Sequence, residues 1–342
     1  MGKLRFGIIS TGNIARQFIE GINGGATRST VTAAASRSIH SAKAFAETYG
    51  IPTAHGCYDD LLADPDVDAV YNALPNLYHK EWTLRALAAG KHVLCEKPMG
   101  MDASEVEEMF AGARAAGRML IEAFMYRTHP QTRAVLAKVH GGAIGEIKLV
   151  RTTFCYRTQK IDGNTRFDRS LGGGAIMDIG CYCVDLARQI TGEDPTTIQA
   201  VGRLHDSTDG CKVDVSASGV LAYPSGILST FTCAMDTQAS NLAQVCGTDG
   251  YIEVPIPWKP NTGSATWTLR TMTRPRQDGV PDEVGEQLQT FSDATDKPLY
   301  ALEADAFAGA VLDGAKPFVS AEESIGNAKV IDELRRQVGV RW

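Results

Sequence analysis

Short apolar runs alternate with segments of helical periodicity along the first third of the chain. Each run is apolar on both faces, and each intervening segment repeats its apolar residues every three or four positions. A parallel sheet that is buried under helices on both faces requires this alternation. The pattern predicts an α/β fold that begins with a doubly wound parallel sheet over residues 1–123, with strands at 4–10, 30–36, 69–75, 91–98 and 118–124 and helices at 13–23, 41–49, 79–89 and 102–116.

Beyond residue 124 the pattern changes to longer strand-like segments. The tetrapeptides "YPSG" and "GTDG" lie between alternating segments and are typical of hairpin turns. We therefore expect residues 124–342 to form an α+β domain for substrate binding and oligomerisation, with a large, open and mostly antiparallel sheet. Because helices would cover only one face of this sheet, we expect a homodimer through the other. Strands are predicted at 147–157, 197–204, 212–237, 242–255 and 265–273, and helices at 175–191, 300–313 and 321–338.

Composition and charge point to small-molecule chemistry. The 342 residues carry a formal charge of −6 and no run of five Lys or Arg residues, which argues against a nucleic-acid or anionic-membrane partner. No apolar run approaches the ~18 residues that span a bilayer, and residues 1–10 resemble a strand rather than a signal peptide, so we expect a cytoplasmic protein. The eight cysteines include no C-x-x-C pair, so we expect small buried thiols, no disulfides and no metal site.

The segment "GIISTGNIAR" at residues 7–16 has the position of a nucleotide-binding turn between a strand and a helix. Gly12 and Ala15 match the later small positions of the glycine fingerprint, whereas Ser10 stands where its first glycine is expected. Serine is acceptable there if the position does not need a positive φ, and we expect its hydroxyl to lie near a pyrophosphate. The predicted cofactor contacts in this turn are Ser10, Thr11, Gly12, Asn13 and Ile14.

The end of the second predicted strand indicates which dinucleotide binds. A site for NAD normally places Asp or Glu there, to hold the ribose hydroxyls. This chain has Ser36, Arg37 and Ser38, a cation with two hydroxyls and no carboxylate. The sequence therefore predicts NADP, with NAD as the less favoured cofactor.

Two further segments should meet the same edge of the sheet. Leu74, Pro75 and Asn76 follow the third predicted strand, and Glu96 and Lys97 follow the fourth. Ligands of doubly wound folds bind beyond the carboxyl ends of the strands, so we expect all of these residues to line one crevice. A lysine at this edge can bond a substrate hydroxyl or carbonyl, and a cis peptide bond at Pro98 is predicted.

Five motifs occur in the order and over the length of a known family. They are "GIISTGNIA", "ALPNLYH", "GKHVLCEKP", "EAFMYRTHP" and "GGGAIMDIGCYCVD". The chain resembles the glucose–fructose oxidoreductase, inositol dehydrogenase and MocA family. Within that family it is most similar to the branch of dimeric dihydrodiol dehydrogenase and NADP-dependent D-xylose 1-dehydrogenase.

The resemblance implies a Rossmann domain and a set of site residues. The catalytic residues it implies are Lys97, Asp178 and Tyr182: the phenol accepts the hydroxyl proton, the ammonium stabilises the alkoxide and the carboxylate orients substrate. Taken alone, "DIGCYC" is equally typical of a helix start in which Asp178 caps and Tyr182 packs. Further implied contacts are His79 and Met125 for the cofactor, and Arg127, Phe154, Arg166, Asp168 and Trp258 for the substrate. A lone histidine such as His79 is more often a structural hydrogen-bonding residue, and Arg166 and Asp168 are equally typical of a solvated loop.

These observations predict an NADP-dependent oxidoreductase that transfers hydride between a sugar or polyol hydroxyl and nicotinamide. A trans-dihydrodiol dehydrogenase is the alternative within enzymes, although Met125 stands where that branch has a tryptophan. A non-catalytic NADP-binding sensor is the alternative from another class, because folds are reused for binding.

Overall fold

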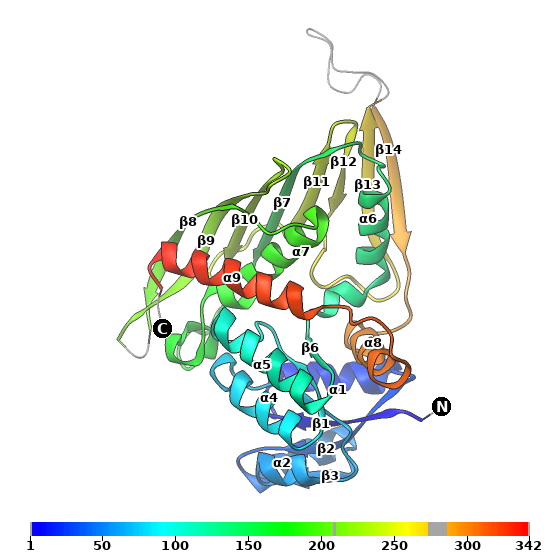
Figure 1. Cartoon of the computed structure of the whole chain (residues 1–342), viewed down its shortest axis with the longest axis vertical. Helices are drawn as coiled ribbons and strands as arrows, with labels where there is room; N and C mark the ends of the chain where they lie inside the picture. The colour runs from blue at the N-terminus through cyan, green and yellow to red at the C-terminus, as the bar shows by residue number, and fades with distance from the viewer. Residues whose placement is uncertain (1, 208–209, 273–285, 341–342) are drawn as a thin grey trace. The chain divides into compact units, whose positions relative to one another are not determined.

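The computed structural model describes residues 2–207, 210–272 and 286–340 and divides into two compact units. The first unit comprises Met1–Thr128, Ser170–Gly172 and Asp296–Lys329, and the second comprises His129–Arg169, Gly173–Thr295 and Val330–Trp342. Figure 1 shows the elements of both, and each unit is described by itself.

The first unit contains a six-stranded sheet in the order β3-β2-β1-β4-β5-β6, in which every pair of neighbours is parallel. This order and the crossover helices confirm the doubly wound parallel sheet. The strands are β1 (Leu4–Ile9), β2 (Ser29–Ala35), β3 (Thr53–His55), β4 (Ala69–Asn72), β5 (His92–Cys95) and β6 (Leu120–Glu122), and the helices among them are α1 (Asn13–Gly25), α2 (Ile39–Tyr49), α3 (Tyr58–Ala63), α4 (His79–Ala88) and α5 (Ala103–Ala116).

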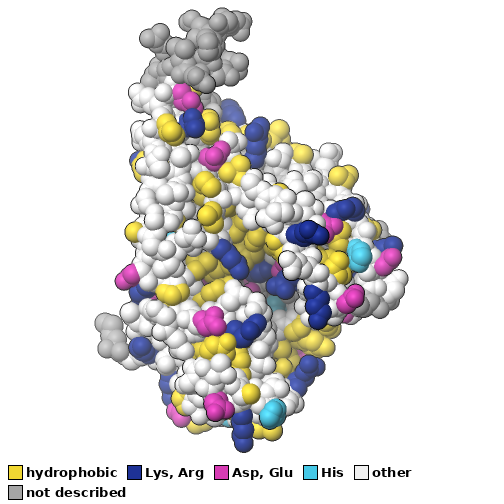
Figure 2. All heavy atoms as spheres, turned by 180° about the vertical axis from the view of Figure 1, so that it is seen from behind, with side chains coloured by type: hydrophobic (Ala, Val, Ile, Leu, Met, Phe, Trp, Pro, Cys, Tyr) yellow, Lys and Arg dark blue, Asp and Glu magenta, His cyan; other side chains and the backbone are white. Residues whose placement is uncertain are grey.

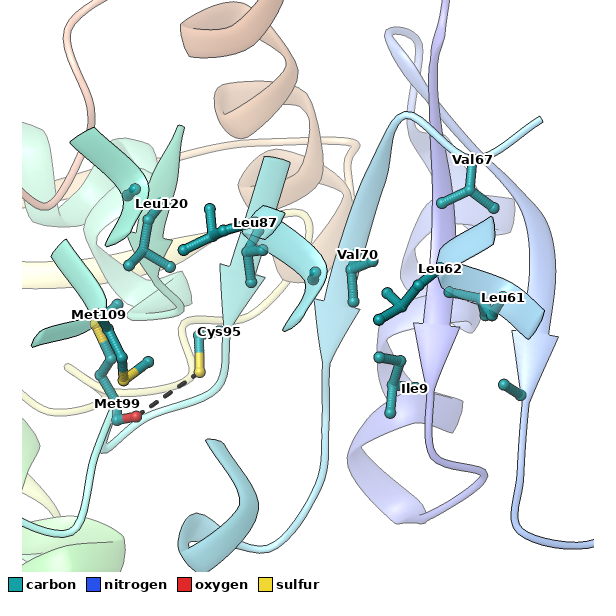
Figure 3. Packing of buried hydrophobic residues seen from close by; sticks show 14 of the residues in the cluster. Ile9, Leu61, Leu62, Val67, Val70, Leu87, Cys95, Met99, Met109 and Leu120 are labelled. Carbon is teal, nitrogen blue, oxygen red and sulfur yellow. Dashed lines mark hydrogen bonds between the residues drawn. The ribbon is translucent and has the colours of Figure 1, made fainter. Parts of the chain in front are cut away.

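Buried side chains from β1, β4, β5 and the helices that cover them form one core of this unit (Figure 3). Ile9, Val70 and Leu87 are each 2 % exposed or less. Cys95 belongs to this core, and its thiol donates a hydrogen bond to the Met99 carbonyl at 3.8 Å. The alternate residues of the same strands, on the other face of the sheet, are also buried, so both faces are covered and the strands read as continuous apolar runs.

A C-terminal helix packs with the N-terminal strands. In α8 (Leu299–Asp313), Phe307 lies 5.6 Å from Phe6 between ring centroids, and Tyr300 approaches α1 at Gly21, where an added Cβ would lie 2.6 Å from the Tyr300 Cβ. The first unit therefore includes residues 296–329, which lie far beyond the boundary expected at 123/124. Helix α9 (Ala321–Val338) contributes residues to both units.

The second unit is built on an eight-stranded sheet in the order β14-β13-β12-β11-β7-β10-β9-β8. All neighbouring pairs are antiparallel except β7 with β10, and the predicted hairpins β9–β10 and β11–β12 are present. The strands are β7 (Ile147–Cys155), β8 (Thr197–Asp206), β9 (Lys212–Ala222), β10 (Leu228–Ala234), β11 (Leu242–Gly247), β12 (Gly250–Val254), β13 (Ala265–Met272) and β14 (Glu286–Asp293).

Helices α6 (Pro130–His140) and α7 (Cys181–Thr191) lie on one face of this sheet (Figure 1). α7 contacts β7 and β10, and α6 contacts β13 and β14. Figure 2 shows hydrophobic side chains open among polar ones on the side opposite to the view of Figure 1. On β9 and β10, Val220 and Leu228 are 42 % and 45 % exposed and share one face of the sheet. The large, mostly antiparallel sheet with helices on one face is thus confirmed.

Among the residues that the structure describes, no helix combines the length and the apolar character needed to cross a membrane.

The cysteines are partly as expected. No disulfide joins any of the eight. The expectation that they are buried is wrong for Cys57 and Cys211, which are exposed, because spacing alone does not show which face a thiol occupies.

Candidate active site

The first unit brings four of the predicted segments to one edge of its sheet. Residues 10–14 follow β1, residues 36–38 follow β2, residues 74–76 follow β4 and residues 96–98 follow β5. These four strands are neighbours and parallel, so their carboxyl ends meet at the same edge. This edge carries every cofactor contact predicted from the strand pattern.

The turn after β1 corrects one expectation. Ser10 has φ 108°, the only positive φ among the described residues other than glycine. Serine there was expected to be acceptable only without a positive φ, and this condition is not met. The strain is partly offset because the Ser10 hydroxyl accepts a hydrogen bond from the N–H of Gly12 at 3.1 Å, just before α1 begins. The serine therefore shapes the turn itself.

The loop after β2 presents Arg37 at the surface. Its two serine neighbours have structural bonds: the Ser38 hydroxyl accepts from the N–H of Ser41 at 3.4 Å and caps α2, and the Ser36 N–H donates to the His55 carbonyl at 3.2 Å. The guanidinium of Arg37 is thus the charged group that this loop offers to a ligand.

His79 ties the loop after β4 to the loop after β5. Its Nδ1 lies 2.9 Å from the Pro98 carbonyl oxygen and its Nε2 lies 2.8 Å from the Leu74 carbonyl oxygen. Both partners are acceptors, so only a protonated ring could donate to both. Burial disfavours the protonated ring more strongly than the two carbonyls favour it, and it lowers the pKa of His79 to about 4. The ring is therefore neutral and donates to one of the two carbonyls. Contact of His79 with a cofactor remains a prediction.

Two buried carboxylates hold the backbone around Lys97. Glu96 accepts a hydrogen bond from the Lys97 N–H at 3.2 Å and another from the hydroxyl of Tyr71, and Glu122 accepts from the Met99 N–H at 3.0 Å. The Lys97–Pro98 peptide bond is cis, as predicted. The half-buried Lys97 side chain therefore extends from a loop whose backbone is fixed.

The two remaining predicted residues of this unit, Met125 and Arg127, lie in the segment after β6. Met125 is 3 % exposed. Arg127 donates to a Glu323 carboxylate oxygen at 2.8 Å and to the Phe318 carbonyl at 3.1 Å. Because the side chain of Arg127 is 4 % exposed, these bonds give it a structural role, and its substrate contact stays a prediction.

In the second unit, Asp178 and Tyr182 lie one turn apart at the start of the helix on β7 and β10. Asp178 belongs to a π-helical turn (Ile176–Gly180), and Tyr182 lies in the first turn of α7. One Asp178 oxygen accepts from the Tyr156 hydroxyl at 2.5 Å and from the Arg166 Nε at 3.0 Å. Burial and the Asp178 charge raise the pKa of Tyr156, which keeps its hydroxyl a donor.

Sequence reasoning missed Tyr156. Tyr156 directly follows β7. Its position at the end of a strand, within "FCYR", was the sequence feature that could have identified it as a site residue. Asp168, a predicted substrate contact, lies in the loop between Tyr156 and Asp178. Its backbone carbonyl accepts a hydrogen bond from the Gly173 N–H at 2.9 Å.

Aromatic rings border the Tyr182 phenol. The Phe154 ring lies 5.3 Å from the Tyr182 ring edge to face and 5.5 Å from the stacked Trp258 ring, measured between centroids. The Trp258 indole N–H donates to the Thr153 carbonyl at 2.8 Å, which fixes the indole plane. The unit thus combines a carboxylate bonded to a hydroxyl and a guanidinium with a phenol on an apolar wall.

Comparisons with known proteins agree with both units. Residues 4–124 match the model of the oxidoreductase family with an NAD-binding Rossmann fold, and residues 132–253 match that of the GFO/IDH/MocA C-terminal domain. The chain belongs to the GFO/IDH/MocA oxidoreductase family. This confirms the family indicated by the five motifs and the Rossmann character of the first sheet.

Relatives that match over nearly the whole chain indicate which branch of the GFO/IDH/MocA family it resembles most. The chain is 35 % identical over 343 residues to a trans-1,2-dihydrobenzene-1,2-diol dehydrogenase of Mus musculus, covering 99 % of this chain and 98 % of the relative. It is 37 % identical over 333 residues to a D-xylose 1-dehydrogenase (NADP(+)) of Haloferax volcanii, covering 97 % and 96 %. A 3-ketoreductase from Actinomadura kijaniata, solved with NADP and TDP-benzene, matches with TM-score 0.84, 34 % identity and 98 % coverage of both chains.

The positive φ at Ser10 predicts an order of stabilities. Ser10→Gly removes the strain, whereas Ser10→Ala keeps it and loses the bond to Gly12, so the glycine variant should be more stable than the alanine variant by about 1 kcal/mol. Chemical denaturation of both measures this difference. The matched pair at Ser218, which is exposed in strand β9, should show the reverse order. An alanine variant at position 10 as stable as the glycine variant would contradict the strain.

Burial of His79 predicts a loss of stability in acid. The pKa is about 4 in the folded chain against 6.5 ordinarily, so between these values only the unfolded chain takes up the proton. Stability therefore falls as pH decreases through this window, by about 2 kcal/mol from pH 7 to pH 5. Urea denaturation at both pH values should show this loss in the wild type and in a variant of the exposed His40, but not in His79→Gln. Parallel losses in all three would be inconsistent with a buried neutral ring.

Proposed function

We propose that this chain is an NADP-dependent oxidoreductase that oxidises a hydroxyl group of a monosaccharide or related polyol. The observation that carries this proposal is the pairing of Asp178 and Tyr182 at one helix start, with Arg166 and Tyr156 bonded to the carboxylate. Such a group can hold a polyhydroxylated substrate and take a proton from it. The D-xylose 1-dehydrogenase relative supports a sugar as substrate.

The residues at the edge of the first sheet fit NADP. The turn at residues 10–12 precedes the N-terminus of α1, where backbone N–H groups and the helix dipole favour a phosphate. Arg37 at the end of β2 is suited to a 2′-phosphate, and no carboxylate stands beside it in residues 36–38 to hold a free ribose hydroxyl. Residues 10–14, 36–38 and 74–76, together with Glu96, would hold the cofactor, which supplies a hydride acceptor.

The protein's own residues have separate roles in removing the proton from the substrate hydroxyl. Tyr182 in its phenolate form takes the proton of the substrate hydroxyl at its phenolic oxygen and becomes a neutral phenol, and Lys97 stabilises the developing alkoxide with its ammonium group. Asp178, held by Tyr156 and Arg166, orients the neighbouring hydroxyl groups. The wall formed by Phe154 and Trp258 limits the water that reaches the phenol.

The same aromatic wall favours a second candidate, oxidation of a trans-dihydrodiol. Phe154 and Trp258 beside Tyr182 would suit an apolar ring, and the mouse relative is a dihydrodiol dehydrogenase. The charged pair of Arg166 and Asp178 beside that wall favours the more polar sugar. A non-catalytic NADP sensor remains the alternative from another class.

Turnover distinguishes these functions. The protein is incubated with aldoses, inositols and trans-dihydrodiols, with NADP or NAD, and absorbance at 340 nm is followed. We expect turnover with an aldose or polyol and at least about a tenfold higher kcat/KM with NADP, because Arg37 pairs with the extra phosphate. Turnover with diols alone would support the second candidate. NADP binding without turnover on any substrate would support the sensor, and a preference for NAD would contradict the role of Arg37.

We also propose a homodimer through the uncovered face of the eight-stranded sheet. Thr230 of β10 pairs with Val220 of β9, and both face away from the buried Phe231 and Leu221, which leaves Val220 and Leu228 open. Light scattering after size exclusion should return about twice the chain mass of 36.7 kDa. Leu228→Lys should shift the particle toward the monomer, and Ile39→Lys, at an exposed position at the start of α2, should not. A wild-type particle of one chain mass would exclude the dimer.

A further inference from the structure

The helix that carries Asp178 and Tyr182 begins without a cap from its own sequence. The residue before its first turn, Ala175, has no side-chain acceptor, and the preceding residues 172–174 are glycines. The first N–H groups of a helix need acceptors, above all where they are buried. At this helix start an acceptor comes from a different element of the second unit.

That acceptor is Asp214, from strand β9. Its Oδ2 accepts a hydrogen bond from the Ile176 N–H at 2.7 Å, and the side chain is 0 % exposed. Ile176 is the first residue of the π-helical turn that contains Asp178. A buried carboxylate thus bonds to the helix end that carries the proposed catalytic groups, at the end where the helix dipole favours a negative charge.

A β-bulge brings Asp214 to this position. In the pairing of β9 with β8, Arg203 faces Ser216 and Leu204 faces Asp214, so Val215 is an additional residue on β9. With regular alternation, Asp214 would share the face of Ser216, Ser218 and Val220, which are partly or fully exposed. The extra residue instead turns the carboxylate toward the helix.

The glycine before the helix is matched to this carboxylate. Gly174 has φ +126°, and a Cβ added there would lie 2.3 Å from Oδ1 of Asp214. Any side chain at position 174 would therefore collide with the carboxylate as well as strain the backbone. This explains why the third residue of "GGGAIMD", Gly174, is a glycine: the Asp214 carboxylate occupies the space that its side chain would need.

We infer that Asp214 is a positioning residue for the reaction, which sets the register of the helix start on the sheet and so holds Asp178 against Tyr156 and Tyr182 against Phe154. The inference deepens the proposed function and rests on it only for its kinetic consequence. Asp178 lies two residues beyond the bonded N–H, so a shift of the first turn moves its carboxylate directly. Small displacements of catalytic groups can lower rates by about a hundredfold.

Amide hydrogen exchange tests the inference independently of any activity. In Asp214→Ala, exchange of the amides of residues 176–182 should be about tenfold faster than in the wild type, because the cap is lost. Asp214→Asn keeps an acceptor oxygen and should restore most of the protection. Asp206→Asn, which removes an exposed carboxylate of β8 paired with Lys212, is the matched control and should change nothing in this segment. Unchanged exchange in a folded Asp214→Ala protein would overturn the inference.

Kinetics provide the second readout. If the proposed function holds, Asp214→Ala should lower kcat by about ten- to a hundredfold while the Kd for NADP stays unchanged, and Asp214→Asn should recover most of the rate. A folded Asp214→Ala enzyme with wild-type kcat would contradict the positioning role. Absence of turnover in the wild type would overturn the proposed function alone, because the exchange measurement still decides the role of Asp214.

A third variant covers failure of Asp214→Ala to fold. Gly174→Ala drives a Cβ into Asp214 from the other side and should accelerate exchange in the same segment. In an Asp214→Ser background the side chain is shorter and leaves room for the added Cβ, so Gly174→Ala should have a smaller effect than in the wild type. Strictly additive effects of the two substitutions would show that Gly174 and Asp214 do not act through one contact.

Discussion

Buried carboxylates bonded to backbone N–H groups are the constraint on which both halves of the proposed site depend. A carboxylate removed from water must find donors, and here the donors belong to the segments that carry the reacting groups. Glu96 bonds to the Lys97 N–H and Asp214 bonds to the Ile176 N–H, two residues before Asp178. Each bond fixes the backbone of a short segment and thereby orients the functional side chain that extends from that segment.

The fold around these bonds follows from elementary rules to a large extent. Apolar runs predicted the central strands of the parallel sheet because both of their faces are buried, and the carboxyl-end rule then predicted which loops meet at one edge. Strand β3 and helix α3 were not predicted, since they are three and six residues long and carry too few positions to show a period. Helix α6 begins within the motif "THP" and β14 is exposed along most of its length, so neither has a clear apolar pattern.

The details of the site are less visible in the sequence. The carboxylate partner of Arg127 is Glu323, nearly two hundred positions away. Tyr156, which follows β7, bonds to Asp178, and Asp214 of β9 bonds to Ile176. Such pairings depend on tertiary packing, which a single sequence does not reveal. Ser10 shows a related difficulty, because the φ of a residue is set by the turn that it joins and serine gives no sign of a positive value. The glycines of "GGGAIMD" did carry a signal, which became interpretable only with the Asp214 carboxylate beside them.

The proposed reaction depends on Tyr182 as the group that takes the proton. The most direct test is the single-turnover rate of hydride transfer in Tyr182→Phe, measured together with the Kd for NADP. We expect the rate to fall by at least about a hundredfold while cofactor binding is unchanged, because the ring still packs against Phe154 and only the hydroxyl is lost. A Tyr182→Phe protein that transfers hydride at the wild-type rate would contradict this role of Tyr182.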